Sequence, residues 1–363
     1  MSPDLRDELV ALTCDLVRFE STAARPEQLA AVIDYAAAYL ADIPGIHVER
    51  SVAADKPALV VTLRPTRSPA LMLNGHLDVV VGRPEQFEPQ LRDGRIYGRG
   101  AQDMKGSCAV MLRLIRELAA LPEPPDVGFQ FVTDEEIGGA DGTGRLLEQG
   151  WRCDFMLCLE PTDMGILFEH KGGMWMQLRI PGRPAHGSRP WEGHNPVGEL
   201  TRGLIAIAER YPVPASDEWR TTVTPTQILV GEGGSRNQVP AEALLTFDIR
   251  WTSDTSPEQI RADIAACFPT AELLVSASGP GLYTDPEHPA VCRVAEAVER
   301  RIGRTPRFYR EHFATDARYY TNAGIPAICV GPVGAGLHSD EEWVSIDSLV
   351  DLYQICQELS TAM

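Results

Sequence analysis

Residues 74–80, with the sequence NGHLDVV, close a run of apolar residues at 70–73. The apolar run predicts a buried strand, and Gly75 permits a sharp turn at its end. His76 and Asp78 are two residues apart, so in an extended chain they point to the same side. A histidine that binds a metal through one ring nitrogen needs an acceptor at the other, which a carboxylate provides. The stretch alone is equally consistent with a structural histidine at a strand end, so the other acidic and histidine residues decide between the two.

The size and charge of the chain limit its architecture and its partners. Its 363 residues exceed one ordinary hydrophobic core and predict two domains. Hydrophobic residues make up 44% and charged residues 23%, which is typical of a globular protein. The net charge of −18 repels phosphate backbones, so nucleic acid is not expected as a partner.

The sequence also predicts a cytoplasmic protein that does not bind membranes. The first residues are acidic and lack the apolar stretch of a signal peptide, and no run has the length of a membrane span. The eight cysteines are scattered, without a second closely spaced pair that would complete a zinc site. We expect all eight to be reduced and packed in the interior.

The first part of the chain alternates helices and strands. Ser2 and Pro3 are expected to begin a helix with the apolar stripe Leu5, Leu9, Leu12 and Leu16. A glycine-rich loop at 98–106 precedes another helix and contains Asp103. Such a loop can bind phosphate, but its glycine spacing is not that of a P-loop or a dinucleotide site, and Asp103 could be a plain helix cap.

Acidic residues follow two further strand-like runs. Asp134, Glu135 and Glu136 come after the run at 126–133, and Glu160 comes after the run at 155–159. Consecutive carboxylates at the end of a buried strand are costly unless they are paired or bind metal. The carboxyl ends of the strands are where an open α/β sheet places its site.

The pattern changes at about residue 173. Met174, Met176, Leu178 and Ile180 alternate with other residues and predict a strand with one apolar face. The following elements have the order β-α-β-β-α-β, which is ferredoxin-like. We therefore expect an inserted domain at 173–282, between the two parts of a catalytic domain at 1–172 and 283–363. In the second part, a buried strand at 325–330 leads through a flexible loop to His338.

The collected candidates are two histidines and several carboxylates. This donor set suits Zn²⁺, Co²⁺ or Mn²⁺, and one carboxylate can bridge two ions. One acid must then remain free to take the proton of the attacking water. The candidates are His76, Asp78, Asp103, Glu135, Glu136, Glu160 and His338.

At this point the sequence resembles the dinuclear-zinc metallopeptidase family of acetylornithine deacetylase, succinyl-diaminopimelate desuccinylase, aminoacylase and glutamate carboxypeptidase. The matching segments are in family order and span nearly the whole chain. They are 74–80, 98–106, 133–139, 160–162, 186–188, 195–196, 233–240, 248–250, 315–316 and 338–339. The resemblance implies an α/β fold: a zinc-exopeptidase-like mixed-sheet catalytic domain with an inserted ferredoxin-like α+β domain.

The family's residue roles carry over to matching positions. His76 and Glu160 would complete one metal site, and Glu136 and His338 would complete the other. Asp103 would bridge the two ions, and the peptide after it is typically cis in the family. Asp78 would orient His76, and Glu135 would act as the general base and then as the general acid. The implied cofactor is a pair of divalent ions, Zn²⁺ in the first place, with Co²⁺ or Mn²⁺ as alternatives.

Three residues of the inserted domain resemble family residues that contact the substrate. His186 resembles the histidine that polarises the scissile carbonyl from a neighbouring subunit, which implies a homodimer formed through the inserted domain. Asn237 and Arg250 resemble the groups that hold the carbonyl and the carboxylate of the substrate. Asn195 is expected to be a helix N-cap and His312 a surface or pocket-lining residue.

The resemblance implies a hydrolase of amino-acid metabolism that removes the acyl group from an N-acyl-L-amino acid. The segment 169–173, with the sequence EHKGG, is closer to the deacetylase than to the arginine-rich desuccinylase version, which mildly favours a small acyl group. A dipeptidase or glutamate-type carboxypeptidase of the same family is the first alternative. A metal-dependent binding module without catalysis is the second, and the intact Glu135 argues against it.

Overall fold

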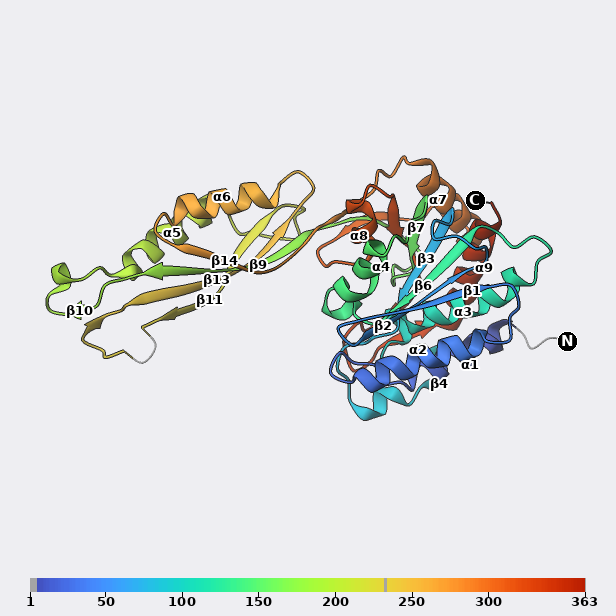
Figure 1. Ribbon diagram of the computed structural model, residues 1–363. Helices are drawn as coiled ribbons and strands as arrows, with labels where there is room; N and C mark the ends of the chain where they lie inside the picture. Colours follow the sequence, from blue (N-terminus) through green and yellow to red (C-terminus); the bar gives the residue numbers. More distant parts are fainter. Residues whose placement is uncertain (1–4, 232–233, 363) are drawn as a thin grey trace. The chain divides into compact units, whose positions relative to one another are not determined.

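The computed structural model describes residues 5–231 and 234–362, which form two compact units (Figure 1). Unit 1 comprises 1–169, 282–311 and 315–363, and unit 2 comprises 170–281 and 312–314. The inserted domain expected at 173–282 stays a prediction, and unit 2 overlaps this range. Ser2 and Pro3, expected to begin the first helix, lie outside the described residues.

Unit 1 is built on a nine-stranded mixed sheet. Its strands are β1 (His47–Ala53), β2 (Lys56–Thr62), β3 (Leu71–His76), β6 (Val127–Val132), β7 (Phe155–Cys158), β8 (Ile166–His170), β15 (Leu282–Tyr283), β16 (Phe308–Glu311) and β17 (Ala327–Cys329). The order is β1-β2-β6-β3-β7-β17-β8-β15, with β16 paired to β8. The central strands β6, β3, β7 and β17 are mutually parallel, so their carboxyl ends meet at one edge.

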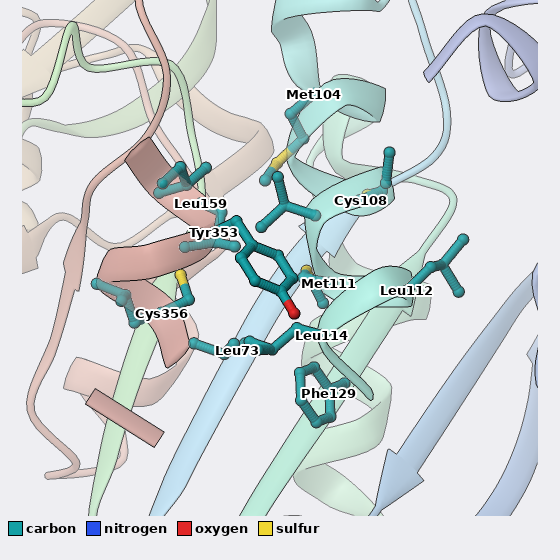
Figure 2. Close-up of a cluster of buried hydrophobic side chains, with 14 of the residues drawn as sticks. Leu73, Met104, Cys108, Met111, Leu112, Leu114, Phe129, Leu159, Tyr353 and Cys356 are labelled. Atoms are coloured by element: carbon teal, nitrogen blue, oxygen red, sulfur yellow. The ribbon is translucent and has the colours of Figure 1, made fainter. Parts of the chain in front are cut away.

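Helices cover both faces of this sheet (Figure 1). One hydrophobic core joins one face to the helices α1 (Leu5–Val17), α2 (Pro26–Leu40), α3 (Gly106–Ala119), α7 (Pro289–Ile302) and α9 (Ile346–Ala362). A second core joins the other face to α4 (Arg145–Glu148) and α8 (Ala317–Asn322). Figure 2 shows part of the first core, where Tyr353 of α9 and Met111 of α3 meet Leu73 of β3. The long stretches of buried residues in β3 and β6 follow from this coverage on both faces.

A small four-stranded sheet of unit 1 connects two loops at the edge of the main sheet. Its order is β18-β19-β5-β4, and its strands are β4 (Gln90–Arg92), β5 (Arg95–Tyr97), β18 (Gly334–Ala335) and β19 (Trp343–Ser345). The pairing of β19 with β5 joins a segment near the C-terminus to the strand that leads into the loop at 98–106. This sheet therefore brings Asp103 and His338 onto one local framework.

Unit 2 contains a four-stranded antiparallel sheet with two helices on one face. The strands are β9 (Gly172–Pro181), β11 (Thr222–Val230), β13 (Glu242–Trp251) and β14 (Glu272–Gly279), and their order is β11-β13-β9-β14. Apolar side chains of β9 and β13 pack with α5 (Pro196–Arg210) and α6 (Pro257–Cys267). A short pair, β10 (Ala185–His186) with β12 (Gln238–Val239), lies apart from this sheet. The chain order and strand order are those of a ferredoxin-like domain.

The expected fold class is confirmed: unit 1 is a mixed-sheet α/β domain and unit 2 is ferredoxin-like. The prediction of eight packed cysteines is wrong for Cys292, which is exposed on the amphipathic helix α7. Cys267 is half-buried and packs against the core of unit 2. All eight are free thiols. No helix among the described residues combines the length and apolar character that crossing a bilayer requires.

The ends of unit 2 lie side by side, which predicts that it can be removed without unfolding unit 1. A Cβ built on Gly281 would lie 2.7 Å from the carbonyl oxygen of His170. Joining these two positions by a short Gly-Ser linker should leave a shortened chain that unfolds cooperatively, because both cores of unit 1 remain intact. Circular dichroism with thermal unfolding measures this. A shortened chain without a cooperative transition would contradict it.

Candidate metal centre

The parallel strands of unit 1 bring the candidate ligands to one edge. His76 is the last residue of β3, Glu135 and Glu136 follow β6, and Glu160 follows β7. In the pairing of β3 with β6, His76 lies beside Val132 at the end of β6. The register of the parallel strands therefore brings side chains that are far apart in the sequence to one edge.

Two groups of donor atoms result from this placement. His76, Glu135 and Glu160 form the first group, and Asp103, Glu136 and His338 form the second. Within each group the donor atoms lie within 4.8 Å of one another.

Asp103 connects the two groups. Its Oδ1 lies 3.0 Å from Nε2 of His76, and its Oδ2 lies 3.4 Å from Nε2 of His338. In turn, Nε2 of His338 is 3.2 Å from Oε2 of Glu136, and Nε2 of His76 is 4.0 Å from Oε2 of Glu160. One carboxylate therefore faces a histidine on each side, which is the arrangement expected of a bridging ligand. The peptide after Asp103 is cis, as the resemblance implied.

The buried carboxylates repel one another. Burial, with the neighbouring Glu160, raises the pKa of Glu135 well above its usual range. Burial likewise raises the pKa of Glu160 to about 8, with Asp103 and Glu136 adding to the rise. Burial also opposes ionisation of Asp103, but hydrogen bonds with His338 and His76 lower its pKa below the usual value. Burial is thus the main cause of the raised pKa of both glutamates, and the neighbouring carboxylates add to it.

The two groups fit a pair of divalent ions. Each offers one imidazole and two carboxylates, which is a donor set for Zn²⁺, Co²⁺ or Mn²⁺. The mutual repulsion of the buried glutamates is what bound cations would relieve. The side chains that would hold them are His76, Asp103, Glu136, Glu160 and His338.

Asp78 has a contact that its spacing from His76 does not reveal. Its carboxylate accepts hydrogen bonds from the backbone N–H groups of Glu135, at 3.3 Å, and of Glu136, at 3.0 Å. Nδ1 of His76 lies 2.9 Å from the backbone oxygen of Asp78 and 3.5 Å from its carboxylate. Asp78 therefore fixes the turn that carries both glutamates as well as the imidazole.

Sequence reasoning overlooked the second support of this turn. Gly139 has a φ of +66°, and a Cβ there would lie only 1.9 Å from Oδ1 of Asp316. The carbonyl oxygen of Gly138 accepts hydrogen bonds from Arg318, at 2.7 Å, and from Tyr319, at 2.5 Å. The N-terminal part of α8 thus holds the residues after Glu136 in place. The only sequence signal was the position of the 315–316 motif directly before this helix.

His338 comes from a less constrained part of the chain. Its side chain is half-exposed, and its backbone is left-handed with a φ of +58°. Such a conformation is uncommon for a residue with a side chain and persists only where the surroundings hold it. Hydrogen bonds with Asp103 and Glu136 raise the pKa of His338 to about 10. Asp103 and Glu136 thus hold the imidazole in place within the second donor group.

Two of the candidate residues of unit 2 lie together. Pairing of β10 with β12 brings Nδ2 of Asn237 to 3.4 Å from Nε2 of His186. Nδ1 of His186 accepts a hydrogen bond from the backbone N–H of Ser188, at 3.2 Å. The amide nitrogen of Asn237 can only donate, so both ring nitrogens of His186 face a donor group of the protein. Both side chains are exposed.

Arg250 is engaged within its own strand. Its Nε and Nη2 donate to the two carboxylate oxygens of Asp248, at 2.8 and 3.0 Å. Asp248 also accepts from the indole of Trp175, at 2.9 Å. The guanidinium is thus oriented by Asp248 on the polar face of the sheet, away from the core.

The helix-cap prediction for Asn195 is confirmed, because its side chain accepts from the N–H of Val197 at the start of α5. His312 is exposed and lies 2.8 Å from Asp217.

The family model of Peptidase family M20/M25/M40 matches residues 72–362. The chain belongs to this family. As an M20 family member it is a hydrolase of amide bonds. It is 30% identical to a succinyl-diaminopimelate desuccinylase of Stenotrophomonas maltophilia, over 80% of this chain and 83% of that one. A second, of Methylorubrum extorquens, is 33% identical over 78% of this chain and 80% of the relative.

Solved M20 structures share the fold over nearly the whole chain. The aminopeptidase PepT of Bacillus cereus matches with a TM-score of 0.79 and 18% identity, covering 99% of both chains. The YXEP protein of Bacillus subtilis, described as a dinuclear metal-binding peptidase of the M20 family, matches with a TM-score of 0.72 and 15% identity. That match covers 98% of this chain and 97% of YXEP. These matches show that the overall fold is shared with this chain.

The double role of Asp78 predicts that Asp78→Asn weakens metal binding. An amide keeps one acceptor oxygen but turns an NH₂ group toward another donor, so the turn at Glu135 and Glu136 loses one hydrogen bond. Affinity for divalent ions should fall about 10- to 100-fold, as is usual when a partner of a ligand is removed. Competition with a chromogenic chelator measures this. Asp347→Asn, at an exposed site, is the control, and equal affinity in both variants would contradict the assignment.

Proposed function

We propose that the protein is a metal-dependent amidohydrolase that removes the acyl group from N-acyl-L-amino acids, in the manner of the desuccinylases and acetylornithine deacetylases. The observation that carries the proposal is the arrangement of two donor groups joined by Asp103, with Glu135 beside them. The curated relatives act, by their names, on a succinylated amino acid. A peptidase acting on dipeptides or a glutamate-type carboxypeptidase is the alternative within the same family.

The chemistry divides between the ions and the protein. Two bound ions, Zn²⁺ in the first place, would polarise the scissile carbonyl and acidify the attacking water. Glu135 takes the proton from the water as it attacks the acyl carbon. The same carboxyl then delivers the proton to the nitrogen of the leaving amine. Asp78 holds the backbone of Glu135 during both transfers.

Unit 2 would supply the groups that recognise the rest of the substrate. With a proton on Nε2, His186 would stabilise the oxyanion that develops from the acyl carbonyl, and the amide of Asn237 beside it would donate to the same oxygen. Arg250 can bind the α-carboxylate through two parallel hydrogen bonds, since Asp248 already orders its guanidinium. A substrate carboxylate would then add to, or exchange with, the pairing to Asp248.

His186 would act on the site of a second subunit in a homodimer. The outer strand of the unit 2 sheet supports such an assembly, because β11 is an edge strand with mostly exposed residues. Ile228, Leu229 and Val230 at its end are 48%, 40% and 40% exposed. An apolar edge strand of this kind favours pairing with a second copy about a two-fold axis. We place the enzyme in the cytoplasm, in the metabolism of amino acids.

Glu135→Gln tests the proposed base. Glutamine keeps the size of the side chain but cannot accept the proton, so kcat should fall by about 10²- to 10⁴-fold while the metal content remains near two ions per chain. Steady-state kinetics and elemental analysis measure the two quantities. The substrates should include N-acetyl and N-succinyl amino acids, their α-carboxamides and a set of dipeptides. Turnover of dipeptides alone would favour the peptidase, and no turnover with any amide would refute hydrolysis.

Subunit mixing tests the donor of His186. His186→Ala and Glu135→Gln should each be nearly inactive as homodimers. A heterodimer of the two contains one complete site, because the subunit with Glu135 receives His186 from its partner. An equal mixture under exchange conditions should recover about a quarter of the wild-type activity. Recovery that stays at the level of the parents, despite demonstrated exchange, would show that His186 does not act across the dimer.

A further inference from the structure

Glu342 is a buried carboxylate outside the two donor groups. It directly precedes β19, its residue is 2% exposed, and its neighbour Glu341 is exposed on the surface. Burial of a carboxylate is costly unless the charge is matched by several donors. The identity of these donors therefore indicates what the residue does.

Four hydrogen bonds from one loop converge on the carboxylate of Glu342. Its Oε2 accepts from Nη1 of Arg99, at 2.8 Å, and from the backbone N–H of Gly100, at 3.0 Å. Its Oε1 accepts from the backbone N–H groups of Gln102, at 3.0 Å, and of Asp103, at 3.2 Å. The backbone oxygen of Glu342 also accepts from Gly98, at 3.1 Å. All five contacts lie in the segment that carries Asp103.

This loop needs an acceptor from elsewhere in the chain. The backbone at Asp103 and Met104 is not helical, with φ and ψ of −118° and 91° and of −132° and 37°. Gly100 is left-handed with a φ of +79°, and a Cβ there would lie 2.5 Å from Val79. The N–H groups at the start of the loop consequently have no preceding helical turn to bond. The carboxylate of Glu342 accepts the hydrogen bonds that such a turn would accept.

Glu342 also belongs to the segment that delivers His338. Three residues lie between the two in sequence, and β19, which begins directly after Glu342, pairs with β5 just before the loop. The carboxylate thus joins the backbone around Asp103 to the backbone that follows His338. Oδ2 of Asp103 and Nε2 of His338, which lie 3.4 Å apart, thus belong to two segments that Glu342 joins.

We propose that Glu342 is a positioning residue of the metal centre, which sets the bridging carboxylate of Asp103 against His338 by holding the backbone of its loop. An ion pair with Arg99 alone would satisfy the charge of Glu342. The three backbone N–H donors are not needed to neutralise this charge. They belong to Gly100, Gln102 and Asp103 itself. The proposal rests on the metal centre proposed above and assigns Glu342 no direct contact with ion or substrate.

Glu342→Gln, compared with Glu341→Gln as a matched control, tests the proposal. An amide can accept from only one of the two donor pairs, so the other pair faces an NH₂ group. In the metal-free protein, amide hydrogen exchange in the loop at 98–106 should become faster, while exchange in β6 and α3 stays at the wild-type rate. Affinity for Zn²⁺, measured by chelator competition, should fall about 10- to 100-fold. The control should match the wild type in both measurements.

Arg99→Gln separates positioning from simple charge pairing. This variant removes the ion pair but leaves the three backbone bonds to Glu342, so its Zn²⁺ affinity should stay within about threefold of the wild type even if its thermal stability falls. Equal loss of affinity in Arg99→Gln and Glu342→Gln would overturn the proposal. Wild-type exchange and affinity in Glu342→Gln would overturn it too.

A shorter carboxylate covers the case in which Glu342→Gln does not fold. Glu342→Asp keeps the charge but is too short to reach both donor pairs, so it should fold and still lose Zn²⁺ affinity. A folded Glu342→Asp with wild-type affinity would overturn the proposal. Since exchange is measured without metal and affinity without substrate, a failure here is distinct from a failure to hydrolyse N-acyl amino acids.

Discussion

The unit 1 site depends on the burial of several like charges at one end of a parallel sheet. The strand ends of β3, β6 and β7 bring His76, Glu135, Glu136 and Glu160 together, and the loop before α3 adds Asp103. Repulsion among these groups opposes folding unless cations and fixed dipoles compensate it. The protein itself supplies only part of the compensation, through histidines and through backbone N–H groups that are directed at Asp78 and Glu342. Two bound divalent cations would compensate the rest of the repulsion.

The elements of the fold were largely predictable because their signals are local. Apolar runs, helical stripes and the β-α-β-β-α-β order depend on neighbouring residues, and the structure has strands and helices where these patterns occur. The residues of the two donor groups were also predictable, because they lie in motifs that occur in family order along the chain. The hydrogen bonds between distant segments of unit 1 could not be predicted from the sequence. The bond from Asp103 to Glu342 spans 239 residues, and no pattern along the chain connects the two.

Other side-chain contacts were also not predictable, because they depend on which nearby donor or acceptor a side chain reaches in the folded protein. Asp248 and Arg250 belong to one matching segment of the sequence, yet the pairing of their side chains follows only from the rotamers seen in the structure. His76 and Asp78 were expected on one side, but the carboxylate of Asp78 also binds N–H groups from the turn after β6. Periodicity predicts the direction of a side chain. It does not predict which of several nearby donors that side chain will bind.

The position of β17 has a consequence for the order of folding. In the sheet this strand lies between β7 and β8, although its residues 327–329 follow both by well over a hundred positions. While the chain emerges from the ribosome, the place between β7 and β8 stays empty until the C-terminal part has been synthesised. All of unit 2, whose contacts are mostly internal, is completed before then. Unit 2 can therefore fold during synthesis, whereas the main sheet closes only near its end, when the segment with His338 also arrives.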